Sequence, residues 1–172
     1  PFVDAGAYFP GWDASPANPR DLWRLVEHLA ANEPSGSATC VPDHPDLSPY
    51  FRRHAGREGQ RFGGGIGRLR AVEHRQRVTR QAHSSSCFNL VGAAQVGKAS
   101  LSGMRLFNRL DGRIPFWPFD PLPDEGPAII EIYTSLAARE AGVRAGRSKI
   151  RDKEGLFAAL DALGSPHRDY AR

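Results

Sequence analysis

The chain has 172 residues, of which 40% are apolar and 24% are charged, an ordinary composition for a globular domain with one core. No apolar run approaches the ~20 residues that a membrane-spanning helix needs, and the N-terminus has no basic stretch followed by an apolar core. Cys40 and Cys87 fit neither a disulfide framework nor a zinc site. We therefore expect a cytoplasmic protein with reduced thiols and no membrane association.

The positive charge is concentrated in one segment. The net charge is +4, yet nine arginines between Arg52 and Arg80 face only Glu58 and Glu73, so this segment alone carries +7. Such a basic block can contact the phosphate groups of a nucleic acid. An arginine-rich helix and loop in contact with solvent has the same composition, and both interpretations remain open.

The N-terminal part predicts one amphipathic helix. Asn18 and Pro19 form an N-cap and first-turn pair, and apolar residues recur at helical spacing until Pro34 ends the pattern. Residues 39–41 can form a short strand between prolines. The abrupt start at Pro1, without an initiator methionine, indicates a fragment of a longer chain.

The middle of the chain predicts a loop and two helices. The glycine run at residues 63–67 indicates a mobile loop, followed by a helix from Arg68 to about Arg80. Asn89 is placed to cap a long helix that ends near Gly112. The apolar period of this second helix is imperfect.

The C-terminal part alternates strands and helices. Residues 114–117 predict a strand, and residues 128–133 form an almost continuous apolar run, typical of a parallel strand buried on both faces. A helix follows from Thr134 or Ser135 to a C′ glycine at Gly142, and a last helix covers residues 153–163. This order predicts a single α/β domain over residues 1–172.

Glu131 is the most informative residue for function. A lone carboxylate within an apolar strand is costly to bury unless it is paired, bound to a metal, or placed at the open end of the strand. Glu131 lies near the C-terminal end of its strand, where ligands of open α/β sheets collect. A glutamate that pairs with an arginine, or that points outward from an edge strand, explains the same pattern.

Residues 92–98 nearly match the phosphate-binding P-loop. In that motif, glycines let backbone N–H groups surround phosphates and a lysine neutralises their charge. Here Ala99 occupies the position of the hydroxyl that ligates magnesium, and the segment lies within a predicted helix. Nucleotide hydrolysis is therefore not supported, although Lys98 can still contact an anion or remain in solvent.

Other polar residues give weaker indications. Spacing by three or four places Arg70, Glu73 and Arg77 on one helix face, as a charge-paired surface or a phosphate contact. A second basic cluster at residues 147–151 suits either phosphate or solvent. The histidines lack metal-ligand spacing, and the serines lack a G-x-S-x-G elbow.

The sequence resembles an uncharacterised bacterial family. The resemblance rests on residues 88–98 (FNLVGAAQVGK), on the Ser-Gly-Met at 102–104 and on the Ile-Glu-Ile-Tyr at 130–133. It extends to residues 70–73 and 146–149. The members of this family are domains of unknown function described as predicted nucleases with a ribonuclease-H-like fold.

The resemblance implies a mixed, five-stranded sheet flanked by helices. Acidic residues at adjacent strand ends would hold Mg²⁺ for phosphodiester hydrolysis. Glu131 matches the acidic position of the family's E-x-Y segment. Two further carboxylate positions, one in a strand before Pro1 and one in a helix after Arg172, have no counterpart. We therefore expect a ribonuclease-H-like fold that is incomplete at both ends.

These observations lead to one main hypothesis and two alternatives. The main hypothesis is a metal-dependent phosphodiester hydrolase of unknown substrate, with Glu131 as catalytic residue and Mg²⁺ ligand. The candidate phosphate contacts are Arg68, Arg70, Lys98, Arg147 and Lys149. The alternatives are a non-catalytic domain that binds nucleic acid, a nucleotide or another anion through its basic surface, and a helper protein that binds a small anionic metabolite.

Overall fold

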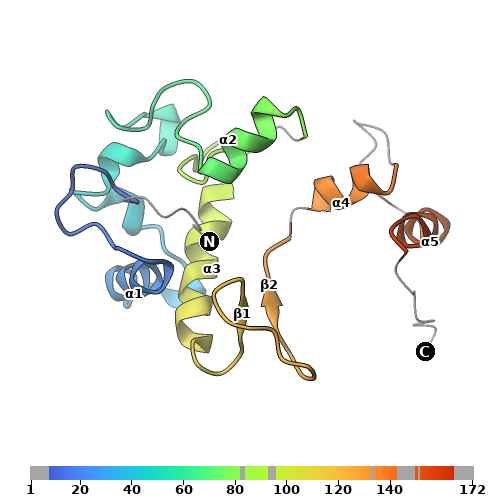
Figure 1. Cartoon of the computed structure of the whole chain (residues 1–172). Coiled ribbons are helices and arrows are strands. Elements are labelled where there is room, and N and C mark those ends of the chain that lie inside the picture. The colour runs from blue at the N-terminus through green and yellow to red at the C-terminus, as the bar shows by residue number, and fades with distance from the viewer. Residues whose placement is uncertain are drawn as a thin grey trace. The chain divides into compact units, whose positions relative to one another are not determined.

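The structure, a computed structural model, describes residues 8–81, 84–92, 96–132, 134–142, 150 and 152–164. It divides into two compact units, Pro1–Ile130 and Glu131–Arg172, and each is described by itself. The first unit holds the helices α1 (Pro19–Leu29), α2 (Ala71–Val78) and α3 (Val96–Leu110) and the strands β1 (Phe116–Trp117) and β2 (Ile129–Ile130) (Figure 1). The second holds α4 (Thr134–Glu140) and α5 (Lys153–Ala162). The chain is therefore α/β, as predicted, with a small two-stranded sheet.

The first helix agrees with its sequence signals. The side chain of Asn18 accepts a hydrogen bond from the Asp21 N–H at 3.0 Å, and Pro19 occupies the first turn of α1. The apolar face of the helix is buried through Leu22, Trp23 and Val26. The predicted N-cap and helix are confirmed.

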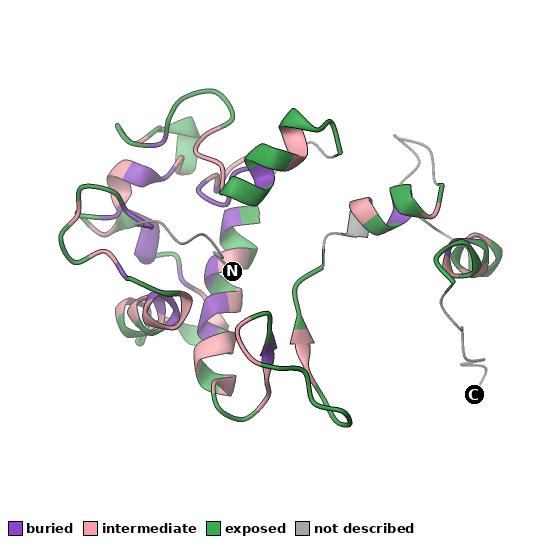
Figure 2. Ribbon diagram, viewed as in Figure 1, coloured by how far each residue is buried: buried purple, intermediate pink, exposed green. Residues whose placement is uncertain are grey.

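The core of the first unit forms where α1 packs on α3. Figure 2 shows buried segments along the side of α3 that faces α1. The buried residues of α3 include Leu101 and Met104. The Trp23 ring lies 5.2 Å from that of Phe116 and 5.4 Å from that of Phe107, in tilted and edge-on contacts. These aromatic contacts tie α1, α3 and β1 together.

Helix α3 begins later than predicted. The backbone around Asn89 is extended, because the Arg52 N–H donates to the Phe88 carbonyl at 3.1 Å and the Leu90 N–H donates to the Arg52 carbonyl at 3.0 Å. A backbone that pairs with another segment cannot begin a helix, so the prediction of a helix from Asn89 is wrong. The predicted end is confirmed, since α3 stops at Leu110 and Gly112 has a φ of 75°.

The sheet is smaller and more exposed than the sequence indicates. Strands β1 and β2 are parallel, with Phe116 opposite Ile129 and Trp117 opposite Ile130. Phe116 and Ile129 pack on the core, whereas Trp117 is 48% exposed and Ile130 47% exposed. Because successive residues of a strand point to opposite faces, one face of this pair is open to solvent. The prediction of a strand buried on both faces is therefore wrong.

Residues 39–41 form no strand. The Glu33 carboxylate accepts hydrogen bonds from the backbone N–H groups of Thr39 at 2.9 Å and Cys40 at 2.5 Å. The chain then enters a short 3-10 turn, Val41–Asp43. These donors are thereby bonded to a side chain, and we attribute the missing strand to this arrangement and to Pro42. Further 3-10 turns are Pro34–Gly36, Ser48–Tyr50 and His54–Gly56.

The glycine run folds over a buried ring. The Gly67 N–H donates to the Gly64 carbonyl at 2.7 Å, and the Arg68 N–H donates to the Phe62 carbonyl at 2.8 Å. Phe62 is 1% exposed, and a Cβ on Gly67 would lie 2.5 Å from its ring. The loop therefore needs glycine for close approach as well as for its φ of 76°. The predicted helix after the loop is present as α2.

The two helices of the second unit match the sequence. Gly142, with a φ of 78°, follows α4 as predicted. The Asp152 carboxylate caps α5 by accepting from the Gly155 N–H at 2.7 Å. Among the described residues, no helix has the length and apolar character required to cross a membrane.

Candidate functional site

Glu131 follows strand β2 directly and is exposed. The expectation that it is buried is wrong, because β2 ends at Ile130 and the chain leaves the sheet there. Its position is still that of a residue at the carboxyl end of a parallel strand. An exposed carboxylate at this place is accessible to a ligand.

A magnesium site is not complete within the described part of the chain. Among these residues, no group of three or more His, Cys, Asp or Glu side chains lies together so that it could hold a metal ion. A hard cation requires several oxygen ligands, and one glutamate supplies at most two. The Glu131 carboxylate is a suitable donor for Mg²⁺, but the described residues do not form the rest of the site.

Arg68 has an aromatic environment. Its guanidinium lies over the ring of Phe88, 5.1 Å from the centroid, and over that of Tyr50 at 5.7 Å. Burial lowers the pKa of the Arg68 guanidinium, which nevertheless stays protonated because the pKa of arginine is so high. Its predicted role as a phosphate contact remains a prediction.

Arg70 is held by Glu73. The Arg70 Nε and Nη2 atoms each lie 2.8 Å from Glu73 Oε1, and the Arg70 N–H donates to Glu73 Oε2 at 2.8 Å. Glu73 is 4% exposed, so this pair forms the N-terminal cap of α2. The predicted charge pair is confirmed, and a phosphate would have to compete with a buried carboxylate for Arg70.

The other predicted phosphate contacts are Lys98, Arg147 and Lys149. Lys98 is exposed on the first turn of α3 and forms no ion pair within the described residues. Arg147 and Lys149 lie outside the described residues. Arg68, Arg70 and Lys98 belong to the first unit, whereas Glu131 opens the second.

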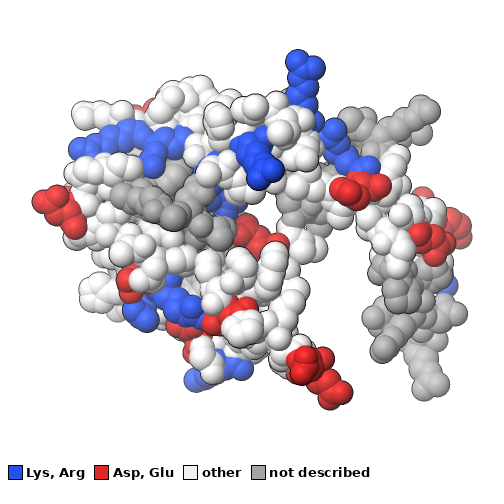
Figure 3. Space-filling model, viewed as in Figure 1, with Lys and Arg blue, Asp and Glu red and all other residues white. Residues whose placement is uncertain are grey.

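Much of the basic block is used internally. Figure 3 shows the lysine and arginine side chains in several separate groups, not as one continuous face, on the side in view. The arginines with a carboxylate or carbonyl partner include Arg52 with Glu58, Arg53 with Asp43, Arg70 with Glu73, and Arg77 with the Ser84 carbonyl. Several arginines of this block therefore stabilise the fold and are not available to a ligand without breaking these contacts.

The segment that resembles a P-loop is a packing site. The Gly97 N–H donates to the Asn89 carbonyl at 3.2 Å. A Cβ on Gly97 would lie 2.4 Å from the Cys87 carbonyl oxygen and 2.8 Å from that of Asn89. This glycine therefore permits α3 to approach the preceding segment closely. Residues 93–95 of the motif lie outside the described residues.

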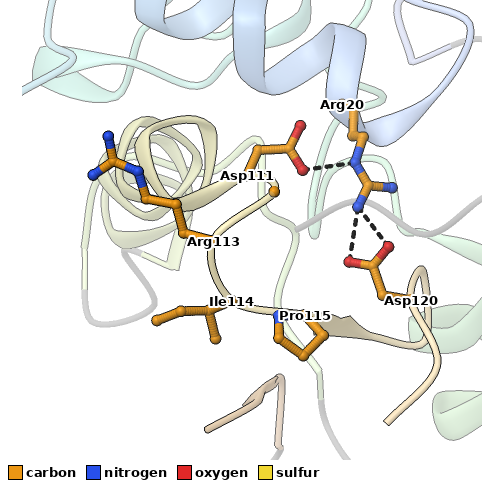
Figure 4. Close-up of a pocket in the computed structure, with 7 residues that line it drawn as sticks. Arg20, Asp111, Arg113, Ile114, Pro115 and Asp120 are labelled. Carbon is orange, nitrogen blue, oxygen red and sulfur yellow. Dashed lines mark hydrogen bonds and ion pairs between the residues drawn. The ribbon is translucent and has the colours of Figure 1, made fainter. Parts of the chain in front are cut away.

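A pocket that sequence reasoning missed lies between α1, the end of α3 and β1. It has a volume of about 490 Å³ and is lined by Arg20, Asp111, residues 112–115 and Asp120. Arg20 Nε donates to Asp111 Oδ1 at 2.8 Å, and Arg20 Nη2 contacts both oxygens of Asp120 at 2.8 Å (Figure 4). Two carboxylates thus neutralise Arg20, and the three side chains connect α1, α3 and β1. Because they lie far apart in the sequence, no local spacing could reveal them.

We expect Asp120 to contribute stability that depends on pH. The hydrogen bond from the Phe116 N–H, at 2.9 Å, and then the Arg20 guanidinium lower the pKa of the Asp120 carboxyl against the opposing effect of burial. A carboxyl whose pKa is lower in the folded state stabilises the fold above its unfolded pKa of ~3.9 and loses that contribution as the pH falls through the folded pKa. The thermal midpoint of Asp120→Asn should therefore depend less on pH than that of the parent chain between about pH 5 and pH 2. Equal dependence in both proteins would contradict this role.

Comparisons with protein-family models, curated proteins and solved structures found no match for this chain.

Proposed function

We propose that the chain belongs to a metal-dependent phosphodiester hydrolase of ribonuclease-H-like architecture, in which Glu131 is a ligand of Mg²⁺. The observation that supports this proposal is the position of Glu131. Its exposed carboxylate follows the second of two parallel strands, at the sheet edge where α/β proteins bind their ligands. The remaining ligands would come from carboxylates outside the described residues.

The basic residues of the first unit agree with a phosphate-bearing substrate. Phosphodiester hydrolysis needs positive charge near the phosphate, and a bound Mg²⁺ supplies it directly. Lys98 is an exposed cation without an ion-pair partner in the described residues. Of the predicted phosphate contacts that the structure describes, Lys98 is exposed whereas Arg68 and Arg70 are only partly so.

A second candidate function is a domain that binds nucleic acid without cleaving it. It is favoured by one observation, namely that the described residues contain no complete group of metal ligands. The two functions share the basic residues and differ in whether Glu131 binds a metal. Metal binding therefore separates them.

Manganese binding to the full chain tests the proposal. Mn²⁺ can replace Mg²⁺ at oxygen ligands. The electron paramagnetic resonance signal of free Mn²⁺ loses intensity when the ion binds, so this intensity measures binding. The parent chain should bind Mn²⁺, and Glu131→Gln should weaken this binding by about tenfold or more, because the variant loses a charged ligand. Circular dichroism of Glu131→Gln should show a folded protein, so that weaker binding reports on the metal site.

Glu125→Gln is the matched control. Glu125 is an exposed glutamate in the loop between β1 and β2, so its substitution removes the same charge from the same region. It should leave Mn²⁺ binding unchanged. Equal losses in both variants would mean that the ion responds only to overall charge, and absent binding in the parent chain would favour the non-catalytic candidate.

A further inference from the structure

Arg61 and Arg68, two arginines of the basic block, lie over one aromatic ring. The guanidinium carbon of Arg61 is 5.4 Å from the centroid of the Tyr50 ring, and that of Arg68 is 5.7 Å from it. Tyr50 is 1% exposed and anchored in the core. The ring therefore holds two positive charges in the same neighbourhood.

These two arginines bond only to neutral acceptors within the described residues. Arg61 Nη1 donates to the Pro10 carbonyl and to the Tyr50 hydroxyl, both at 2.6 Å. Arg68 Nη1 donates to the Tyr8 carbonyl at a long 3.4 Å. Neither has the carboxylate partner that Arg70 has in Glu73, so no carboxylate in the described part of the chain pairs with either charge.

Most donors of the pair remain free for a ligand. The Nε and Nη2 groups of Arg61 and Arg68 make no hydrogen bond in the described residues, although a guanidinium offers five N–H donors. The fully buried side-chain donors without a partner belong to Trp23, Arg52 and Arg53 in the described residues. The unused donors of Arg68 are therefore in contact with solvent. Ring contacts and carbonyls restrict both side chains, which lowers the entropy cost of binding.

The glycine loop lies against one member of the pair, Arg68. A Cβ on Gly63 would be 3.4 Å from Arg68 Cγ, so the loop touches the stem of Arg68. The backbone N–H groups of Gly63, Gly64 and Gly65 donate to no acceptor in the described residues. The loop beside the stem of Arg68 therefore carries backbone donors without an acceptor in the described residues.

We propose that Arg61 and Arg68 together bind a phosphodiester group of a nucleic-acid strand. A phosphate accepts several N–H groups from arginine and would neutralise the two uncompensated charges. We favour a nucleic acid over a free phosphate because the same block also carries exposed Arg57 and Arg75, which form no ion pair in the described residues and add attraction for a polyanion. The inference takes its substrate class from the proposed function, but this binding requires no metal.

Fluorescence anisotropy of a labelled single-stranded oligothymidylate, with the full chain in EDTA over a series of salt concentrations, tests the inference. Arg61→Gln should weaken binding several-fold and reduce the slope of log affinity against log salt by about 0.7, the value for one lost phosphate contact on a single strand. Arg68→Lys should keep the slope but weaken binding, because lysine keeps the charge and loses the planar donors. Circular dichroism should show that both variants are folded.

Arg24→Gln is the control, since Arg24 is an exposed arginine on α1 that pairs with Asp21. It should leave affinity and slope unchanged. Equal losses for Arg24→Gln and Arg61→Gln, or a parent chain that does not bind the strand, would overturn the inference. Displacement of the strand by inorganic phosphate more efficiently than by chloride at equal ionic strength would instead assign the pair to free phosphate. Because this assay contains no metal, its outcome does not depend on whether Glu131 binds Mn²⁺. The two proposals can therefore fail separately.

Discussion

Replacement of Arg105 by alanine should lower the thermal midpoint of the chain by about 10 °C. Arg105 is 1% exposed, and its Nε donates to Glu27 Oε2 on α1 at 2.8 Å. Its Nη1 donates to the carbonyls of Glu33, at 3.1 Å, and Ser37. The substitution leaves two carbonyls without this donor, removes the buried partner of Glu27 and opens a cavity between α1 and α3, and these effects destabilise the fold. Differential scanning calorimetry gives the measurement.

Arg109→Ala separates the effect of burial from that of charge. Arg109 contacts the same Glu27 carboxylate, at 3.0 Å, but its side chain is 54% exposed. Exposed ion pairs contribute at most about 1 kcal/mol, so the thermal midpoint should fall by a few degrees at most. Similar losses in the two variants would show that the salt bridge with Glu27, and not the buried position of Arg105, accounts for the stability.

Gly97→Ala should destabilise the chain by about 2–3 kcal/mol, the cost of overpacking at a close contact. An added Cβ would lie 2.4 Å from the Cys87 carbonyl oxygen and 2.8 Å from that of Asn89, both of which belong to backbone that cannot move without distorting the core. If residues 92–98 instead served as a flexible phosphate loop, the substitution would affect ligand binding more than stability. Urea denaturation measures the free energy of unfolding directly.

Alanine at Gly103 should raise the free energy of unfolding, whereas alanine at Gly97 should lower it. Gly103 lies in the same helix, and an added Cβ would approach no heavy atom closer than 3.9 Å. Alanine is favoured over glycine in a helix interior by about 1 kcal/mol, so Gly103→Ala should stabilise the chain slightly. A loss of stability at both positions would contradict the difference in packing along α3.

Short sequence motifs predicted the helix ends that are stabilised by neighbouring residues in the chain. Asn18 with Pro19 predicted the start of α1, and Gly142 predicted the end of α4, because caps and C′ glycines act within a few residues. The start of α3 was missed, since Arg52 pairs with the backbone at Asn89 from a distant part of the chain. The prediction that Glu131 is buried is wrong for a related reason. An apolar run does not reveal how many of its residues pair with a neighbouring strand.

The candidate site was predictable only in part. The charge block indicated anion binding, but it could not distinguish Arg70, which Glu73 neutralises, from Arg61 and Arg68, which lie over Tyr50. That distinction depends on contacts between segments that are far apart in the sequence. The Arg20 pocket was missed for the same reason. Residue type alone indicates what chemistry is available, and tertiary contacts decide which side chains remain free to perform it.

Metal-dependent cleavage of a nucleic-acid strand is the most direct test of Glu131 as a metal ligand in a phosphodiester hydrolase. A labelled single-stranded oligonucleotide is incubated with the full chain and Mg²⁺ or Mn²⁺, and the products are separated by gel electrophoresis. We expect cleavage that EDTA stops, that Glu131→Gln abolishes while the variant stays folded, and that Glu125→Gln retains. Cleavage that persists in Glu131→Gln, or a parent chain that binds the strand without cutting it in either metal, would contradict the assignment of Glu131 as a metal ligand of a phosphodiester hydrolase.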